Sequence, residues 1–229
     1  MKTKRMILAL ISVALIAFTS CEKDDLGEPV VQLEFKTVTS EFMLKNTSVT
    51  TNSVGFDSGH IILESVEFEL ESDTDSLEME FEVENYITVD FATGETNPDL
   101  SFIRLRQGTY TEMELEIELW DQTEQPAIVL AGSWTDENGT IHPVRFEFDS
   151  GQSFSVEIEG NFVVNENTSM VAEVTFDPGI WFSGVTNEAF SAATKNNDGV
   201  ILINSEENED IYDTVEDMID LVSEVEIEM

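Results

Sequence analysis

A strict alternation of apolar and acidic residues constrains the fold of this chain more than any other feature. Val66, Phe68 and Leu70 alternate with glutamates, and the same pattern continues through residues 77–84 and 112–119. Successive side chains of a β-strand point to opposite faces, so a period of two indicates strands with one buried and one wet face. The sequence therefore predicts a mainly β protein.

The pairing of two of these strands can be predicted to the residue. If residues 66–71 and 77–84 form a hairpin, keeping the apolar residues on one face sets Phe68 opposite Phe81 and Leu70 opposite Met79. A one-residue slip would carry glutamates into the core, so burial fixes the register. Opposed like charges cost about 0.2–1 kcal/mol a pair, and burial of each large apolar residue outweighs this with about 1.5–3 kcal/mol. The glutamate pairs expected in this register are Glu67–Glu82, Glu69–Glu80 and Glu71–Glu78.

The rest of the chain supports the same fold class. Near 208–222 the apolar spacing becomes helical. Many antiparallel strands with one wet face and one late helix predict an antiparallel β-sandwich with a short C-terminal amphipathic helix. Because no internal linker interrupts the pattern, residues 30–229 are interpreted as a single domain. Further short strands between turn residues are expected at 31–35, 103–106, 128–134, 144–148, 154–158 and 170–176.

The N-terminal residues indicate export. A basic start leads into the apolar run Met6–Phe18, and small residues precede Cys21. This order is typical of a signal peptide, here residues 1–20, whereas a membrane-spanning helix needs about 20 apolar residues. The cysteine at the break resembles that of a bacterial lipoprotein signal, in which Cys21 becomes the lipidated first residue of the mature chain.

An acidic tether, residues 21–29, follows the signal peptide. Within it, Lys23, Asp24 and Asp25 resemble the surface-export tag of Bacteroidota lipoproteins, and the alternative is a plain solvated tether. The resemblance implies an outer-membrane protein that is lipid-anchored and exposed at the cell surface.

Charge and cysteine content exclude several classes of function. The net charge is −38, and loss of residues 1–20 removes three of the ten basic residues and leaves −41. Such a surface repels nucleic acid and anionic lipid, so no nucleic-acid partner is expected and contact with the membrane goes through the anchor. Cys21 is the only cysteine, so a lipidated chain has neither a disulfide nor a thiolate metal site.

The acidic strand faces allow two interpretations. One is a solvated face that keeps the protein soluble. The other is a divalent-cation surface, because Ca²⁺ is bound by oxygen ligands. The loop residues to test for Ca²⁺ are Asp73, Asp75, Asp136 and Asn138. No stretch completes an EF-hand calcium loop, and no other cofactor is expected.

The sequence contains no catalytic motif. A nucleophile elbow, a phosphate-binding glycine loop and a zinc motif are all missing, and carboxylate pairs are too numerous to identify a hydrolase. Aromatic residues are better candidates for a ligand site. Trp181 and Tyr110 could stack on sugar rings, whereas the strand spacing of Trp120 and Trp134 indicates core positions.

Three stretches carry a resemblance to a known family. They are the Gly108-Thr109-Tyr110 turn, the run Asn161-Phe162-Val163-Val164-Asn165, and the segment from Val174-Thr175-Phe176-Asp177-Pro178 to Trp181-Phe182. These stretches resemble a family of Bacteroidota lipoproteins that is a domain of unknown function. The resemblance implies an immunoglobulin- or transthyretin-like β-sandwich over residues 55–222 and brings no catalytic residue. Two further sites, at Ser76 and Thr214, resemble the O-glycosylation acceptor of these bacteria.

Two functions from different classes follow as expectations. The first is a non-enzymatic cell-envelope lipoprotein, a surface binding or accessory module for a glycan, a divalent cation or an envelope protein partner. The alternative is a carboxylate-dependent hydrolase acting on polysaccharide. A flat acidic sheet with an exposed aromatic residue favours binding, whereas two inward-facing acids with raised pKa values in a deep cleft favour hydrolysis.

Overall fold

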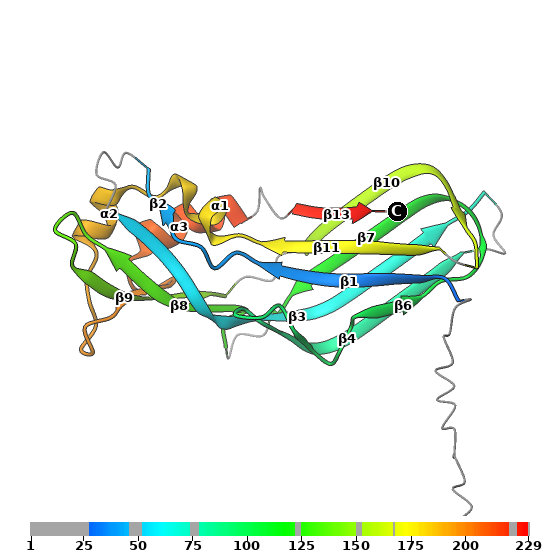
Figure 1. Ribbon diagram of the computed structural model, residues 1–229. Helices are drawn as coiled ribbons and strands as arrows, with labels where there is room; N and C mark the ends of the chain where they lie inside the picture. Colours follow the sequence, from blue (N-terminus) through cyan, green and yellow to red (C-terminus); the bar gives the residue numbers. More distant parts are fainter. Residues whose placement is uncertain are drawn as a thin grey trace, which may run out of the picture.

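The protein is mainly β and elongated, with two halves that share one long strand (Figure 1). The computed structural model describes residues 28–45, 52–73, 78–121, 125–149, 153–166, 168–219 and 224–228. Strand β3 (Ser53–Glu71) runs through both halves, which we call the sandwich half and the helical half. No helix in these ranges is long and apolar enough to span a membrane. Residues 1–27, with Cys21, Lys23, Asp24 and Asp25, lie outside the described part of the chain.

In the sandwich half two sheets face each other. The larger sheet contains, in spatial order, β4 (Met79–Asp90), β3, β7 (Gly108–Leu119) and β10 (Ser153–Val164). The smaller sheet has the order β13 (Glu224–Glu228), β11 (Ser169–Phe176), β1 (Val30–Thr37) and β6 (Phe102–Arg104). Apolar residues of both sheets, such as Phe68 and Val31, form one buried core between them. The expectation of a β-rich, sandwich-like architecture is therefore confirmed at this coarse level.

The hairpin register derived from the alternation is also confirmed. Phe68 pairs with Phe81 and Leu70 with Met79, and Glu67 and Glu69 face Glu82 and Glu80. The register is set by the one arrangement that keeps every large apolar side chain of both strands on the core side.

The expectation of purely antiparallel pairing is wrong at two places. Strand β1 pairs in parallel with β11 over its whole length, from Val30 with Ser169 to Thr37 with Phe176. Strand β12 (Ile201–Ile203) also pairs in parallel with β9 (Ile141–Phe148). Alternation reports which face of a strand is buried and says nothing about the direction of its neighbour, so the period of two could not reveal these pairs.

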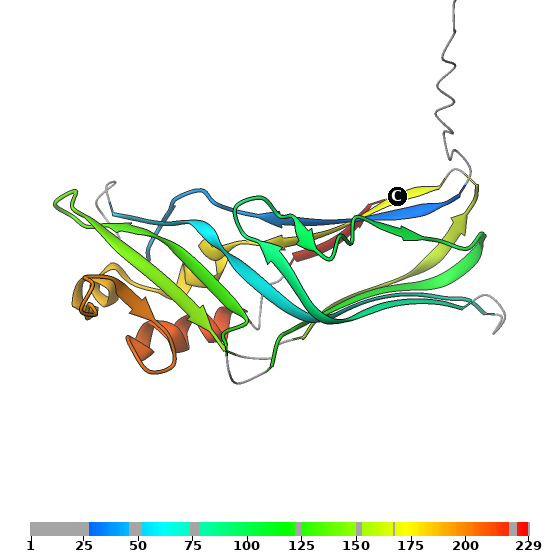
Figure 2. The same cartoon turned by 90° about the horizontal axis from the view of Figure 1, so that it is seen from below.

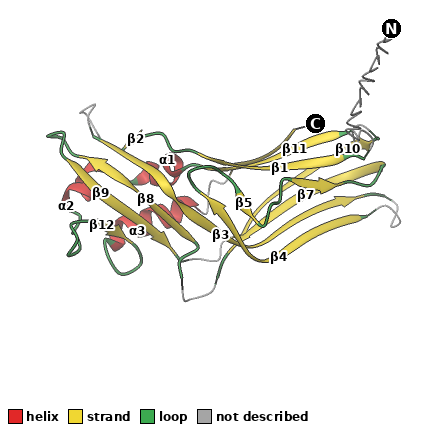
Figure 3. Cartoon of the chain, turned by 60° about the horizontal axis from the view of Figure 1, so that its bottom comes forward, coloured by secondary structure: helices red, strands yellow, loops and turns green. Residues whose placement is uncertain are grey.

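In the helical half, helices cover one face of the sheet (Figures 2 and 3). The sheet consists of β2 (Phe42–Met43), the first part of β3, β8 (Ile128–Thr135), β9 and β12. The short helix α1 (Pro178–Trp181) leads into a 3₁₀ turn (Phe182–Gly184), and α2 (Asn187–Ala192) follows. The amphipathic helix expected near 208–222 is α3 (Glu209–Ile219). The centre of the packing is Phe182, whose ring lies against those of Phe42, Phe56, Phe146 and Phe190.

The larger sheet is distorted where the two halves meet, a region that we call the waist. The interval from Ile117 to Leu119 on β7 is matched by Val66 to Leu63 on β3 and by Val83 to Ile87 on β4. The same stretch of sheet thus contains one more residue on β3 than on β7, and one more on β4 than on β3. Such extra residues on neighbouring strands are stacked β-bulges. Tyr86 lies in the bulge of β4 with a φ of 47°, a left-handed conformation that costs a non-glycine residue roughly 1–2 kcal/mol.

Candidate functional site

The two aromatic residues expected to stack on sugars are both in the core, which corrects that expectation. Trp181 is 1 % exposed and Tyr110 is 0 % exposed. Asp177 caps α1 by accepting a hydrogen bond from the backbone N–H of Gly179 at 2.7 Å, so the chain turns into a helix there. Trp181 consequently points inward against Phe176. The Tyr110 hydroxyl donates to the Arg106 carbonyl at 2.7 Å, which satisfies it without a ligand.

The described loop residues proposed for Ca²⁺ lie in two separate places. Asp136 lies in the β8–β9 turn, where its Oδ1 accepts hydrogen bonds from the backbone N–H groups of Asn138 and Thr140 at 2.8 Å. These bonds and the neighbouring His142 lower the pKa of Asp136. Asp73 follows the other end of β3, about 60 Å away at the rise of an extended strand. Asp75 lies outside the described residues, as does Ser76.

The outer side of the larger sheet carries a regular array of acids that we call the glutamate face. Seven Glu–Glu pairs stand directly opposite one another on neighbouring strands. All basic residues of the described ranges lie outside this array. The pairs are Glu67–Glu82, Glu69–Glu80, Glu67–Glu116, Glu69–Glu114, Glu71–Glu112, Glu114–Glu157 and Glu112–Glu159.

The centre of the glutamate face is electrostatically strained. Desolvation by burial, together with Glu67, Glu80 and Glu114, raises the pKa of Glu69 to about 7. Carboxylate oxygens of Glu67, Glu69 and Glu80 lie within 4.8 Å of one another. This cluster lies on the outer side of the sheet, whereas a hydrolase holds a carboxylic acid with a raised pKa in a desolvated site. A group of exposed acids also does not by itself identify a cation as its ligand.

At the waist the structure exposes an aromatic residue that the sequence analysis did not single out. Tyr86 is 45 % exposed, and its ring meets that of Trp120 edge to face at 5.3 Å and 84°. The backbone N–H of Trp120 donates to the carbonyl of Ile62 at 3.1 Å. Ile62 alternates with the core residues of β3 and therefore lies on the outer face, yet it is fully buried. The waist thus presents an aromatic platform on an apolar base.

Polar groups surround a hollow of about 410 Å³ next to Tyr86. The oxygen Oδ1 of Asp90 accepts hydrogen bonds from the backbone N–H groups of Ala92 and Thr93, which leaves Oδ2 without a partner among the described residues. Burial and the charge of Arg145 lower the pKa of His60, so its ring is neutral near pH 7. A neutral imidazole offers one donor and one acceptor. The other residues that line this hollow are Thr88, Glu95, Thr96 and Asn97.

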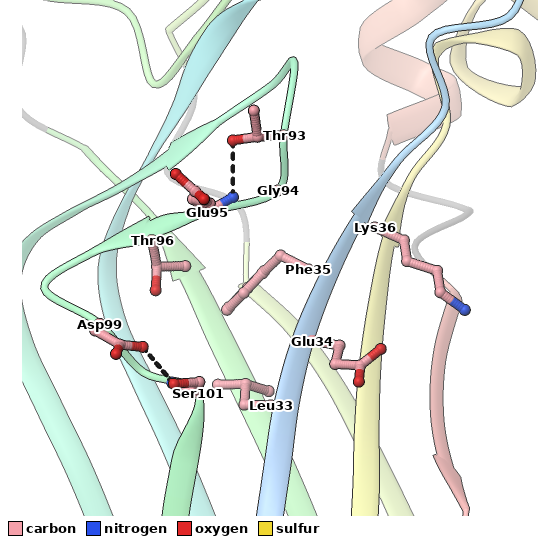
Figure 4. Close-up of a pocket in the computed structure, with 10 residues that line it drawn as sticks. All are labelled: Leu33, Glu34, Phe35, Lys36, Thr93, Gly94, Glu95, Thr96, Asp99 and Ser101. Carbon is pink, nitrogen blue, oxygen red and sulfur yellow. Dashed lines mark hydrogen bonds between the residues drawn. The ribbon is translucent and has the colours of Figure 1, made fainter.

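A second hollow, of about 510 Å³, lies between β1 and the segment of residues 93–101 (Figure 4). Leu33 and Phe35 point toward this segment, and Glu34 and Lys36 leave the other side of β1. The segment can approach β1 closely because residue 94 is glycine. A Cβ on Gly94 would stand 2.1 Å from the Phe35 carbonyl oxygen. Glu95 and Thr96 line both hollows, so the two hollows adjoin. We call the two hollows, with the wall that they share, the trough beside Tyr86.

A third hollow, of about 320 Å³, lies on the opposite side of the aromatic pair, where Trp120 meets the glutamate face. The indole N–H of Trp120 is buried without a hydrogen-bond partner in the described part of the chain. Trp134 and Trp181 have the same unpartnered N–H, but only Trp120 borders one of these hollows. The candidate site therefore centres on the Tyr86–Trp120 pair.

One signal in the sequence points to the waist. The buried positions of β3 change from odd numbers, Ile61 and Leu63, to even numbers, Val66 and Phe68. Such a change of parity requires an extra residue in the strand, and bulges occur preferentially next to binding and active sites. No such change occurs along β4, because Val83 and Ile87 both have odd residue numbers. The bulge of β4 therefore leaves no mark in the sequence pattern.

Comparison of the chain with protein families, curated proteins and solved structures gives no match. Of the two O-glycosylation candidates, Thr214 is on α3, where its hydroxyl donates to the Asp210 carbonyl at 2.9 Å.

Proposed function

We propose that this protein is a non-enzymatic lipoprotein of the cell envelope that binds a glycan at the waist. The observation that carries the proposal is Tyr86, held exposed in a left-handed bulge against Trp120 and beside the trough. A strained backbone conformation persists only where the surrounding structure stabilises it, and such residues concentrate at functional sites. A tyrosine that only covered a solvated sheet face would not need this strained conformation.

The chemistry of the site matches a sugar. A pyranose ring presents C–H groups on one face, which the electron-rich face of an aromatic ring attracts. Its hydroxyl groups need donors and acceptors around the rim, and Asp90, Asn97 and the neutral His60 provide both. Two adjoining hollows of about 410 and 510 Å³ leave room for more than one sugar unit.

The leader sequence supports the proposed address. Residues 1–20, Cys21 and the Lys23-Asp24-Asp25 tag resemble those of a lipoprotein held at the outer membrane and exposed at the cell surface. A lipid anchor suits a domain that carries −41, since an anionic membrane repels it. We also propose that the sandwich half is an immunoglobulin- or transthyretin-like β-sandwich, as the resemblance to the lipoprotein family implies. An envelope protein partner at another surface is compatible with it.

Binding explains the arrangement of the acids better than hydrolysis does. A catalytic acid needs a desolvated site that raises its pKa, and a second carboxylate on the other side of the substrate. The raised pKa of Glu69 arises on an outward-facing sheet. The trough beside Tyr86 instead contains Asp90, whose Oδ1 already accepts two backbone hydrogen bonds, and Glu95.

A glycan array with the purified mature domain tests the proposal. The wild-type protein is expected to retain a defined set of oligosaccharides without releasing shortened products. Tyr86→Ala removes the platform and is expected to lose retention of that set. Phe102→Ala, which truncates an aromatic side chain 61 % exposed elsewhere on the surface, is the matched control and is expected to bind normally.

Three outcomes would contradict the proposal. They are an array on which wild-type protein retains nothing, equal retention by Tyr86→Ala and wild type, and turnover of any retained polysaccharide. The address is tested separately by protease shaving of intact cells. Replacing Lys23, Asp24 and Asp25 with alanine is expected to protect the protein from the protease, and unchanged cleavage would refute a role of the tag in surface exposure.

A further inference from the structure

The larger sheet of the sandwich half ends at β4 on one side and at β10, which lies beside β13, on the other, and the β4 side is open. Strand β4 is hydrogen-bonded to β3 on one edge, and β5 (Thr96–Asn97) covers its other edge only at Thr88 and Val89. From Met79 to Ile87 that edge has no strand partner in the described ranges. Strand β6, at the margin of the smaller sheet, faces the same opening. The exposed N–H and C=O groups of such an edge are a template for a further strand.

The core layer is unfinished at this edge. On β3, Val66, Phe68 and Leu70 are fully buried, whereas their cross-strand partners on β4 are only partly buried. These partners, Val83, Phe81 and Met79, pack against the core from one side. A groove of about 660 Å³ lies beside them, and its other wall consists of Leu105, the 61 % exposed Phe102 and the basic residues Arg104 and Arg106. One additional strand with apolar residues on its inner side would complete the layer.

The charge of the outer side selects the kind of strand. An added strand places its outward side chains next to Glu80, Glu82 and Glu84, the terminal row of the glutamate face. Directly opposed like charges destabilise a sheet and opposite charges stabilise it. A second copy of this chain would bring a glutamate row of its own, so charge disfavours self-association at this edge.

We infer that the free edge of β4 accepts an extended segment of another protein in which apolar residues alternate with lysine or arginine. The segment adds a fifth strand beside β4. Its apolar side chains fill the groove between Phe81 and Phe102, and its basic side chains neutralise the row from Glu80 to Glu84. Main-chain hydrogen bonds contribute affinity and the alternating pockets contribute specificity. The free edge continues into the waist at Val83, but the groove beside Phe81 and Phe102 shares no residue with the proposed glycan site, so the two proposals can fail separately.

A synthetic peptide of about ten residues, a typical upper length for a strand, tests the inference. A peptide alternating valine and lysine is titrated into the mature protein at about 0.15 M salt, where the Debye length is about 8 Å. It is expected to bind at least about tenfold more tightly than a peptide of the same composition with all valines before all lysines. N-methylation of two consecutive central amides removes edge hydrogen bonds and is expected to weaken binding to a similar extent.

Charge variants locate the peptide. The double variant Glu80→Gln and Glu82→Gln is expected to weaken binding severalfold. The matched control, Glu157→Gln and Glu159→Gln on β10, makes the same change of net charge at the opposite edge of the glutamate face and is expected to leave binding unchanged.

Equal binding of the alternating and the block peptide would overturn the inference, because it would leave only non-specific attraction to an acidic protein. Equal losses in both double variants would have the same meaning. A dimer of the protein that the peptide dissociates would show that a second copy occupies the groove, which also contradicts the inference. Binding that survives N-methylation would rule out strand addition.

Discussion

The two halves of the molecule solve the same problem of covering a sheet in different ways. In the helical half, helices cover the sheet (Figure 2). The core between them and the sheet is rich in aromatic rings around Phe182. In the sandwich half a second sheet covers the inner face, and the outer face stays in water with its array of glutamates. The directly opposed glutamate pairs thus lie on the sheet face that stays in water.

The comparison teaches where to look for function. In the helical half, helices cover the sheet face. Local hydrogen bonds explain its acidic turn at Asp136 without a ligand. The sandwich half has an open edge and a strained glutamate face. The waist, where stacked bulges join them, exposes Tyr86. Binding surfaces are therefore expected at the waist and in the sandwich half.

The largest expected effect tests whether the halves are one cooperative unit. Phe68→Ala in the sandwich half and Phe182→Ala in the helical half each remove a fully buried ring and are expected to lower the free energy of unfolding by about 3–5 kcal/mol. Because β3 runs through both halves, both variants are expected to shift one common transition in urea. Two separate transitions, each moved by one variant only, would show that the halves fold independently.

A smaller effect of opposite sign is expected on the glutamate face. Glu69→Gln removes a charge that faces both Glu80 and Glu114, and two like-charged pairs are worth about 0.4–2 kcal/mol together. The variant is therefore expected to be more stable than wild type in urea unfolding near neutral pH. Glu137→Gln, in the β8–β9 turn of the helical half, is the control and is expected to change little. A destabilised Glu69→Gln would mean that the carboxylate makes a favourable contact.

The smallest effect concerns pH. Burial and neighbouring glutamates raise the pKa of Glu69 to about 7, and burial also raises the pKa values of Glu112 and Glu114. A group whose pKa is higher in the folded state binds protons preferentially there. Its contribution to the free energy of unfolding is therefore fully present below the unfolded pKa and is lost as pH rises through the folded pKa. The melting temperature is expected to rise by a few degrees as pH falls from about 8 to about 5.5, and less in Glu69→Gln. Melting that is independent of pH would contradict the strain assigned to this face.

The fold was predictable from the sequence where a pattern has one physical solution. The register of Phe68 with Phe81 follows from burial alone, because any slip would place glutamates inside. The helix α3 follows from its apolar period of about 3.6. The parallel pairing of β1 with β11 joins segments far apart in the chain. Such pairing depends on tertiary packing that no local period encodes.

The candidate site was less predictable for a related reason. Trp181 was expected to stack on a sugar, but the Asp177 cap starts a helix that turns this side chain into the core. Tyr86 was hidden because the bulge keeps the apolar residues of β4 on odd numbers. A search for changes of parity along β3 would have marked the waist. The neighbours of Tyr86 across the sheet, such as Trp120, are set by the register of three strands together.

The affinity of the waist for a glycan tests the central claim most directly. Isothermal titration with the oligosaccharide that the array retains best compares wild type, Tyr86→Ala and Phe102→Ala. The account predicts that Tyr86→Ala loses at least about tenfold in affinity, or about 1.4 kcal/mol, while Phe102→Ala matches wild type. Equal affinities of Tyr86→Ala and wild type would contradict it.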